Sequence, residues 1–217
     1  MHNIEHITLQ GPEVKPASGG KAKSLVVFMH GVGADGNDLI GLASFLSSRL
    51  PDTHFISPNA PQQCDMSPSG YQWFSLRDWS PKSMLEGAKE SAPVVNMFLD
   101  MQLKRLGLTD DKLALVGFSQ GTMMSLFISL RRPHTLAGVA GFSGALIGEE
   151  GIVSKPPICL VHGNADQVVP FAAMGLAEAV LKKHEVEVQT HARRNLGHGI
   201  DPEGLDIVAK FLEERLK

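Results

Sequence analysis

The chain has 217 residues, of which 43% are hydrophobic and 20% charged, and its formal net charge is −3. These values are ordinary for a folded globular protein, and the interspersed charges form no basic patch of the kind that binds nucleic acid. Because the composition does not change along the chain, we expect a single domain spanning residues 1–217.

The two cysteines, Cys64 and Cys159, are far apart in sequence. Their spacing suits neither a metal site nor a disulfide framework. The first six residues lack the basic-then-apolar profile of a signal peptide, and no apolar stretch approaches the roughly 20 residues of a membrane span. We therefore expect a cytoplasmic protein that does not insert stably into membranes.

Short apolar runs alternate with segments of helical periodicity along the whole chain. The predicted strands cover residues 4–10, 24–29, 54–57, 113–116, 136–142, 157–161 and 186–192. The predicted helices cover residues 37–49, 83–106, 120–130, 171–183 and 202–216. This alternation predicts an α/β fold with a mostly parallel sheet covered by helices on both faces. In such sheets the active site lies at the carboxyl ends of the strands.

Some boundaries follow from single residues. Asn37 or Asp38 is expected to cap the first helix, and residues 11–23 are expected to form turns. Pro93 lies inside the second helical segment, which predicts either two helices, the second capped by Ser91, or one kinked helix.

The segment 58–81 is long, rich in proline, and contains both tryptophans and the only tyrosine of the chain. Loops of this length inside compact domains are usually functional. Any one ring is expected to pin the loop to the body of the protein, but as a group the aromatic residues are expected to wall a pocket as well. The expected wall residues are Met66, Trp73 and Phe74 from this segment, and Met123 from the helix at 120–130.

A G-x-S-x-G sequence, Gly117 to Gly121, joins the strand at 113–116 to the helix at 120–130. The strand–turn–helix context is what a nucleophile elbow requires, since glycines permit close passage of strand and helix around a sharp turn. A bare five-residue match would more often be an ordinary serine in a turn. The context predicts instead that Ser119 is exposed at the tip of the turn as a nucleophile.

A serine hydroxyl needs an imidazole to take its proton and a carboxylate to orient that imidazole. In α/β-hydrolases the chain order is Ser, then Asp or Glu, then His. After Ser119, Asp166 follows the strand at 157–161, and His198 lies in a glycine-flanked loop after the last strand. We therefore predict Ser119, Asp166 and His198 as a catalytic triad.

Other candidate bases and acids fit less well, because they lie at strand–turn junctions, on the last strand, near helix ends or in a loop before the wrong strand. They are His30, His162, His191, His134, His184, Glu149 and Glu150. Asp201 follows His198 and is expected to cap the last helix.

An oxyanion needs two preorganised N–H donors. The amide of Gln120 is expected to supply one, and the loop His30–Gly33 the other. That loop could alternatively cradle a phosphate, but it has neither the Lys-Ser/Thr ending of a P-loop nor a full dinucleotide fingerprint.

These motifs together resemble the carboxylesterase/acyl-protein thioesterase family, also described as the phospholipase/carboxylesterase family, and the chain looks closest to its bacterial members. The similarity spans essentially the whole chain. Trp73-Phe74 matches the W-[FY] element of the family. The other matching pieces are His30–Gly33 with Asp35-Gly36, Gly117–Gly121, Phe142–Gly144, His162–Asp166 with Val169-Pro170, and Gly197-His198.

The resemblance implies an α/β-hydrolase without a large cap domain, with no cofactor and no metal. It assigns the triad to Ser119, Asp166 and His198, and the oxyanion N–H groups to Val32 and Gln120. The implied substrates are small-molecule esters or thioesters with short to medium acyl chains, although some members act on palmitoylated proteins or lysophospholipids. It also implies that the protein could form a homodimer.

The predicted function is therefore that of a serine hydrolase working through an acyl-enzyme intermediate. The alternative within the enzyme class is a lysophospholipase or long-chain lipase. The alternative from another class is a hydrolase-fold sensor that binds a ligand without turning it over.

Overall fold

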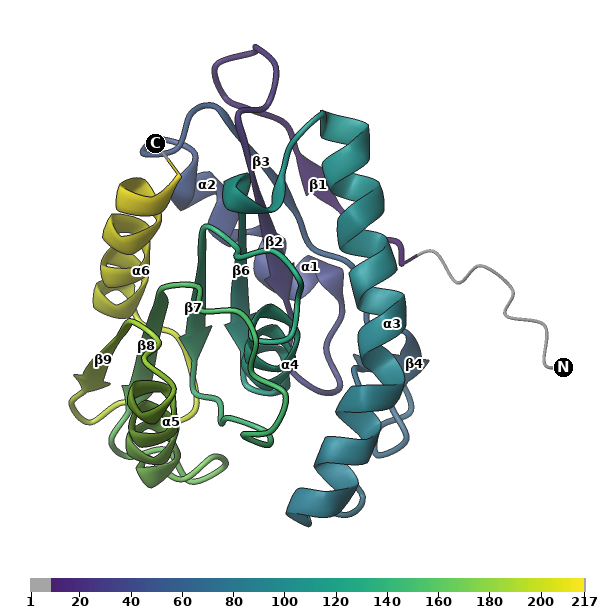
Figure 1. Cartoon of the computed structure of the whole chain (residues 1–217), viewed down its shortest axis with the longest axis vertical. Coiled ribbons are helices and arrows are strands. Elements are labelled where there is room, and N and C mark those ends of the chain that lie inside the picture. The colour runs from purple at the N-terminus through teal and green to yellow at the C-terminus, as the bar shows by residue number, and fades with distance from the viewer. Residues whose placement is uncertain (1–8, 217) are drawn as a thin grey trace, which may run out of the picture.

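The computed structural model describes residues 9–216, which contain a seven-stranded sheet of order β1-β3-β2-β6-β7-β8-β9 (Figure 1). Its neighbouring strands are parallel, except that β1 runs antiparallel to β3. The strands are β1 Glu13–Val14, β2 Ser24–Met29, β3 Thr53–Ile56, β6 Leu113–Phe118, β7 Gly138–Phe142, β8 Ile158–Gly163 and β9 Val188–Arg193. Two further strands, β4 Gln62–Gln63 and β5 Tyr71–Gln72, form a separate pair.

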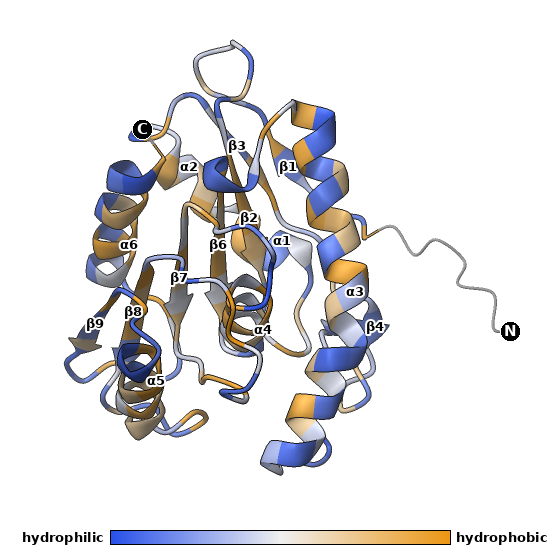
Figure 2. Cartoon of the chain, viewed as in Figure 1, coloured by the Kyte–Doolittle hydropathy of each residue, from blue (hydrophilic) through white to orange (hydrophobic). Residues whose placement is uncertain are grey.

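The central strands are buried on both faces, as their uninterrupted apolar runs predict. Alternate side chains of β2 enter different cores: Val27 packs in one cluster, and Val26 and Phe28 pack in the other. Figure 2 shows apolar residues concentrated in the sheet, while the surface helices alternate between polar and apolar residues.

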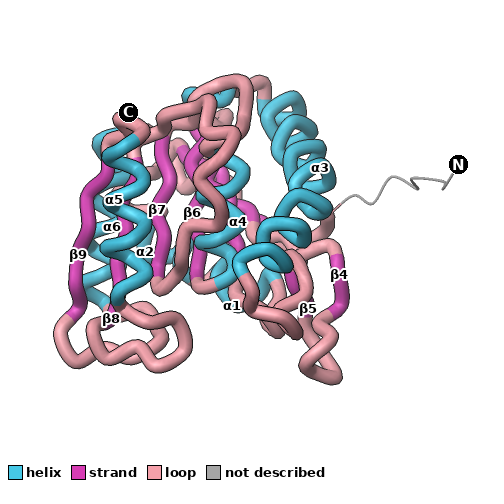
Figure 3. Tube along the Cα trace, turned by 60° about the horizontal axis from the view of Figure 1, so that its bottom comes forward, coloured by secondary structure: helices cyan, strands magenta, loops and turns pink. Residues whose placement is uncertain are grey.

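Helices cover both faces of the sheet. Three helices, α1 Gly36–Ile40, α2 Leu42–Leu46 and α6 Pro202–Arg215, contribute buried residues to the core that contains Val26. Another three, α3 Pro81–Leu106, α4 Gln120–Ser129 and α5 Ala172–Lys183, contribute to the core that contains Val27. In Figure 1 the strands β6 and β7 point to the lower edge, and Figure 3 turns the loops at this edge toward the viewer.

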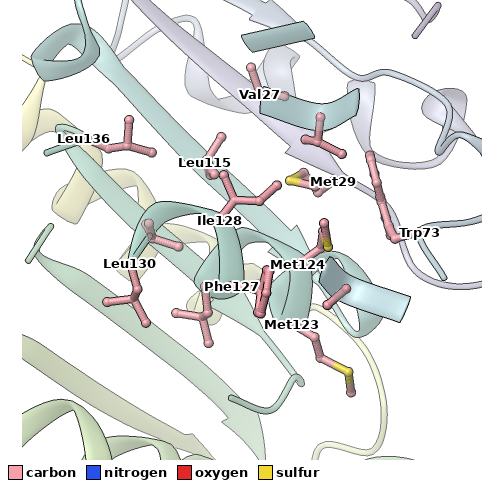
Figure 4. Packing of buried hydrophobic residues seen from close by; sticks show 14 of the residues in the cluster. Val27, Met29, Trp73, Leu115, Met123, Met124, Phe127, Ile128, Leu130 and Leu136 are labelled. Carbon is pink, nitrogen blue, oxygen red and sulfur yellow. The ribbon is translucent and has the colours of Figure 1, made fainter. Parts of the chain in front are cut away.

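Every residue of α4 is buried, and its apolar side chains pack among residues of β2, β6 and the loop before α3 (Figure 4). Its polar side chains can also be buried because each hydrogen-bonds to a backbone carbonyl: Gln120, Thr122, Ser125 and Ser129. Because α4 begins one residue after Ser119, its burial fixes the start of the helix and the turn before it.

The predicted helix at 37–49 is interrupted, and its predicted cap is wrong. Gly41 separates α1 from α2, and Asp35 caps α1 by accepting a hydrogen bond from Asn37 N–H at 2.7 Å. Glycine is a poor helix former, which makes Gly41 a natural point of interruption.

The predicted segment 83–106 is one α-helix, α3, which begins at Pro81 and contains Pro93. Ser80 caps it. Ser91 does not start a second helix, because its hydroxyl donates instead to the carbonyl of Trp73. An interior proline loses one helical hydrogen bond at a cost of about 3 kcal/mol, and α3 nevertheless continues through it, with Val95, Phe98 and Leu99 buried in the core.

Two predictions concern the start of the chain. The predicted strand at 4–10 falls mostly outside the described residues, and Leu9 and Gln10 are not in a strand. The predicted turn region 11–23 contains β1, whose two residues are too few to show a sequence pattern. Between residues 9 and 216, no helix combines the length and the apolar composition needed to cross a membrane.

Candidate active site

Ser119 occupies a strained turn between β6 and α4. Its φ of 53° and ψ of −118° are unusual for a residue other than glycine. A Cβ on Gly117 would collide with the backbone of Gly121 and Thr122, and a Cβ on Gly121 would collide with the carbonyl of Met29. The two flanking glycines are therefore required for the sharp turn that presents the serine.

The structure brings the three predicted residues of the triad together at the carboxyl-end edge of the sheet. The Ser119 hydroxyl donates to His198 Nε2 at 3.0 Å, and His198 Nδ1–H donates to Asp166 Oδ2 at 2.8 Å. Ser119 follows β6, Asp166 follows β8, and His198 follows β9. This arrangement is competent to activate a serine as a nucleophile.

Both oxygens of the Asp166 carboxylate accept hydrogen bonds. Its Oδ1 accepts from the N–H groups of Val168 at 2.8 Å and Val169 at 3.0 Å, and its Oδ2 accepts from His198. Burial alone would raise the pKa of Asp166, but these hydrogen bonds outweigh it and lower the pKa below its ordinary value. The carboxylate therefore stays ionised and can stabilise a positively charged imidazole.

His162 also touches this carboxylate, a contact that sequence reasoning missed. Its Nε2–H donates to Val169 O at 2.9 Å, so it shapes the turn as predicted, but Nε2 also lies 3.3 Å from Asp166 Oδ2. The ring is buried and packs edge-on against Phe171. The spacing of four residues between His162 and Asp166 gave no sign of the contact, which depends on the turn between them.

The loop His30–Gly33 lies beside the elbow. A Cβ on Gly31 would lie 3.6 Å from Ser119 Cβ. His30 Nδ1–H donates to Gly31 O at 2.7 Å and its Nε2 accepts from Ala60 N–H at 3.0 Å, so the ring is neutral. Burial lowers the pKa of His30, partly countered by the bond to Gly31.

The N–H groups of Val32 and Gln120 do not donate to any acceptor within residues 9–216. Gln120 is the first residue of α4, where helical N–H groups lack an intrahelical acceptor and the helix dipole favours negative charge. Free N–H groups beside a serine suit the binding of an oxyanion.

The family model described as Phospholipase/Carboxylesterase matches residues 10–216. The chain belongs to the phospholipase/carboxylesterase family. It is therefore an α/β-hydrolase and a hydrolytic enzyme, as the sequence predicted.

Curated relatives of this hydrolase include acyl-protein thioesterase 1 of Saccharomyces cerevisiae, which is 27% identical over 90% of this chain and 94% of its own. Acyl-protein thioesterase 1 of Neurospora crassa is 31% identical, with coverage of 88% and 86%. Among solved structures, esterase PE8 is 41% identical with a TM-score of 0.92, covering 97% of this chain and 100% of its own. Together they support hydrolysis of esters or thioesters.

Three of the four predicted wall residues of this hydrolase are almost completely buried. Trp73 and Phe74 are 0% exposed and Met123 is 2% exposed, so the prediction that they wall a pocket is wrong in this structure. Trp73 and Met123 pack in the core around α4 (Figure 4). Met66 is 50% exposed on the loop surface and lines none of the cavities near Ser119.

An apolar groove lies instead between α5 and the loop after β7. Its cavity measures about 260 Å³, and sequence reasoning missed its lining residues, Ala145, Leu146, Gly148, Glu149, Ala173, Leu176, Ala177 and Val180. Leu176, on the outer side of the groove, is 70% exposed. The first of its lining residues, Ala145, follows Gly144, and a Cβ added to Gly144 would lie 3.0 Å from Ser119 O, so the chain at this end of the groove passes close to the elbow.

Residues 9–216 contain no group of three or more His, Cys, Asp or Glu side chains placed to hold a metal ion. Burial raises the pKa of the Cys159 thiol to about 12, so the thiol stays protonated and is a poor nucleophile.

Proposed function

We propose that Ser119, His198 and Asp166 are the catalytic triad of this hydrolase. The observation that carries the proposal is the continuous hydrogen-bonded chain from Ser119 Oγ through His198 to Asp166, with distances of 3.0 and 2.8 Å, at a strained strand-to-helix turn. An ordinary serine in a turn needs neither the backbone strain nor the two partners.

In the first half of the reaction, Ser119 Oγ attacks the carbonyl carbon of the ester while its proton moves to His198 Nε2. The Asp166 carboxylate orients the ring and stabilises the imidazolium. The carbonyl oxygen becomes an oxyanion that accepts from the N–H groups of Val32 and Gln120. Its collapse expels the alcohol or thiol, which takes the proton from His198, and leaves an acyl-serine.

In the second half, water attacks the acyl-serine while His198 removes its proton. The same two N–H groups stabilise the second oxyanion. Collapse releases the carboxylic acid, and His198 returns its proton to Ser119 Oγ. Each catalytic group is thus restored after one cycle.

The apolar groove beside Gly144 supports the binding of short to medium acyl chains. Its cavity of about 260 Å³ is smaller than the range of about 300–1,000 Å³ typical of sites for drug-sized ligands. The names of the relatives support both ester and thioester substrates, because they include an esterase and acyl-protein thioesterases.

The direct test is labelling with a fluorophosphonate probe together with turnover of p-nitrophenyl esters. We expect labelling of the wild type at Ser119, and Ser119→Ala should lose both labelling and turnover. Full turnover by folded Ser119→Ala would contradict the triad, and labelling without turnover of any ester or thioester would favour the sensor function. A series of acyl lengths would separate a short-chain esterase from a long-chain lipase or lysophospholipase.

A further inference from the structure

Trp73 is hydrogen-bonded to both segments that carry the proposed oxyanion donors. Its ring Nε1–H donates to His30 O at 2.8 Å, two residues before Val32. Its backbone N–H donates to the side-chain Oε1 of Gln120 at 3.0 Å. The residue is 0% exposed, so water does not compete for either bond.

The side-chain amide of Gln120 forms two hydrogen bonds with the segment that contains Trp73. Its Nε2–H donates to Phe74 O at 2.7 Å, while its Oε1 accepts from Trp73 N–H. The amide therefore pairs with the extended backbone of residues 73–74, much as a neighbouring strand would. In addition, the Ser91 hydroxyl on α3 donates to Trp73 O, so a third part of the chain is bonded to the same segment.

Further backbone hydrogen bonds hold the loop after β2, which contains Val32, against the segment 71–74. Gly33 N–H donates to Tyr71 O at 2.8 Å, and Tyr71 N–H donates to Ala34 O at 2.7 Å. The segment 71–74 thus lies between the loop after β2 and the start of α4. These two parts of the chain are far apart in sequence, and no hydrogen bond joins Val32 directly to Gln120 within the described residues.

We propose that Trp73 is a positioning residue that sets the separation and direction of the Val32 and Gln120 N–H groups. The proposal rests on the oxyanion roles assigned under Proposed function. An oxyanion hole works because its donors are fixed before the charge develops. Trp73 acts through the backbone of His30 and the side chain of Gln120, and it does not touch the substrate.

The test compares Trp73→Phe with Trp79→Phe. The first substitution keeps an aromatic ring but removes the N–H that bonds to His30 O. The second makes the same chemical change in the same loop at a ring that is 48% exposed. We expect Trp73→Phe to lower kcat by about 10- to 100-fold, because a misplacement of about 1 Å can cost about 100-fold and the N–H donors themselves are retained. KM and the pH profile should stay close to those of the wild type, because the His198–Asp166 pair is untouched.

An NMR measurement gives a second readout that does not depend on turnover. The amide signals of Val32 and Gln120 should shift in Trp73→Phe and stay in place in Trp79→Phe. If Trp73→Phe does not fold, Gln120→Met provides the same test, because it keeps the backbone N–H of residue 120 but removes both side-chain bonds to residues 73 and 74.

A folded Trp73→Phe with wild-type kcat and unshifted Val32 and Gln120 amides would overturn the proposal. So would a loss that appears only in KM, or an equal loss in Trp79→Phe. None of these three results bears on the triad, which Ser119→Ala tests separately. Conversely, activity that survives in Ser119→Ala would remove the proposed function and this inference together.

Discussion

Arg193 and Asp201 face each other across the base of the loop that carries His198. The Arg193 Nε–H lies 3.1 Å from Asp201 Oδ1 and 3.0 Å from Oδ2. Arg193 is the last residue of β9, and Asp201 caps α6 by accepting from Gly204 N–H at 2.8 Å. The ion pair therefore joins the two ends of the loop 194–200, and so restrains the position of the histidine.

Replacing Asp201 should separate its two roles. Asp201→Ala removes both the cap and the ion pair, and we expect it to lower the free energy of unfolding by about 1 kcal/mol, as for the loss of other caps. Asp201→Asn keeps a good capping side chain but loses the charge, so it should unfold at nearly the wild-type denaturant concentration. Urea titrations of the three proteins measure this. Equal destabilisation by both variants would show that the ion pair, and not the cap, carries the effect.

The Asp166 carboxylate should make the free energy of unfolding depend on pH under acidic conditions. Its pKa in the folded protein is lower than its ordinary value of 3.8. A carboxylate with a lowered pKa contributes stability that is fully present above the unfolded-state value and is lost as pH falls through the folded-state value. Asp166→Asn lacks this contribution, so the gap in unfolding free energy between wild type and variant should narrow as pH falls below 3.8. Urea titrations from pH 7 downward measure it, and a gap independent of pH would contradict it.

The same variant should be nearly inactive at neutral pH. An amide at position 166 can hold His198 in the wrong tautomer, and comparable substitutions in other triads lower kcat by about 10⁴-fold. Assays with p-nitrophenyl esters at pH 7 check this, with the near-UV circular dichroism spectrum as the control for folding. A loss smaller than about tenfold would exclude Asp166 as the residue that orients the histidine.

Local patterns predicted the parts of the structure that depend on short-range physics. The glycines at 117 and 121 and the cap at Asp201 each follow from sterics or hydrogen bonding within a few residues. The chain order of Ser119, Asp166 and His198 could be predicted because parallel strands place their carboxyl ends at one edge of the sheet.

Trp73 shows what local patterns could not predict. An aromatic residue in a long proline-rich loop suggests a pocket wall, yet its ring is buried and its polar atoms bond to three different elements. The partners His30, Ser91 and Gln120 come from the loop after β2, from α3 and from α4. Such a set is defined only by tertiary packing, as is the groove between α5 and the loop after β7.

Gly175 offers a stabilising substitution away from strained backbone. It lies inside α5, is exposed, and a Cβ there would meet no atom within 4 Å. Gly175→Ala should raise the free energy of unfolding by about 0.5–1 kcal/mol, because alanine loses less conformational entropy in a helix. Gly121→Ala is the contrasting variant, since its Cβ would collide with Met29 O, and it should be strongly destabilised. Thermal unfolding of both proteins measures the two effects. A less stable Gly175→Ala would contradict the first.

The proposed acyl groove makes a prediction about chain length. Ala173 lines the groove, and Ala173→Leu would fill part of its cavity of about 260 Å³. We expect kcat/KM for octanoyl esters to fall by roughly 10- to 200-fold, the range for a misfit of one or a few methylenes, while acetyl esters lose little.

The matched control for this prediction is Ala172→Leu, the same change at the preceding residue of α5, which is exposed and does not line the groove. It should leave the profile of kcat/KM against acyl length unchanged. If Ala173→Leu lowered kcat/KM equally for acetyl and octanoyl esters, the substitution would be acting on the shared catalytic groups. The acyl chain would then lie elsewhere, and the cavity beside Phe118 and Ile200, which measures about 270 Å³, would be the next surface to fill.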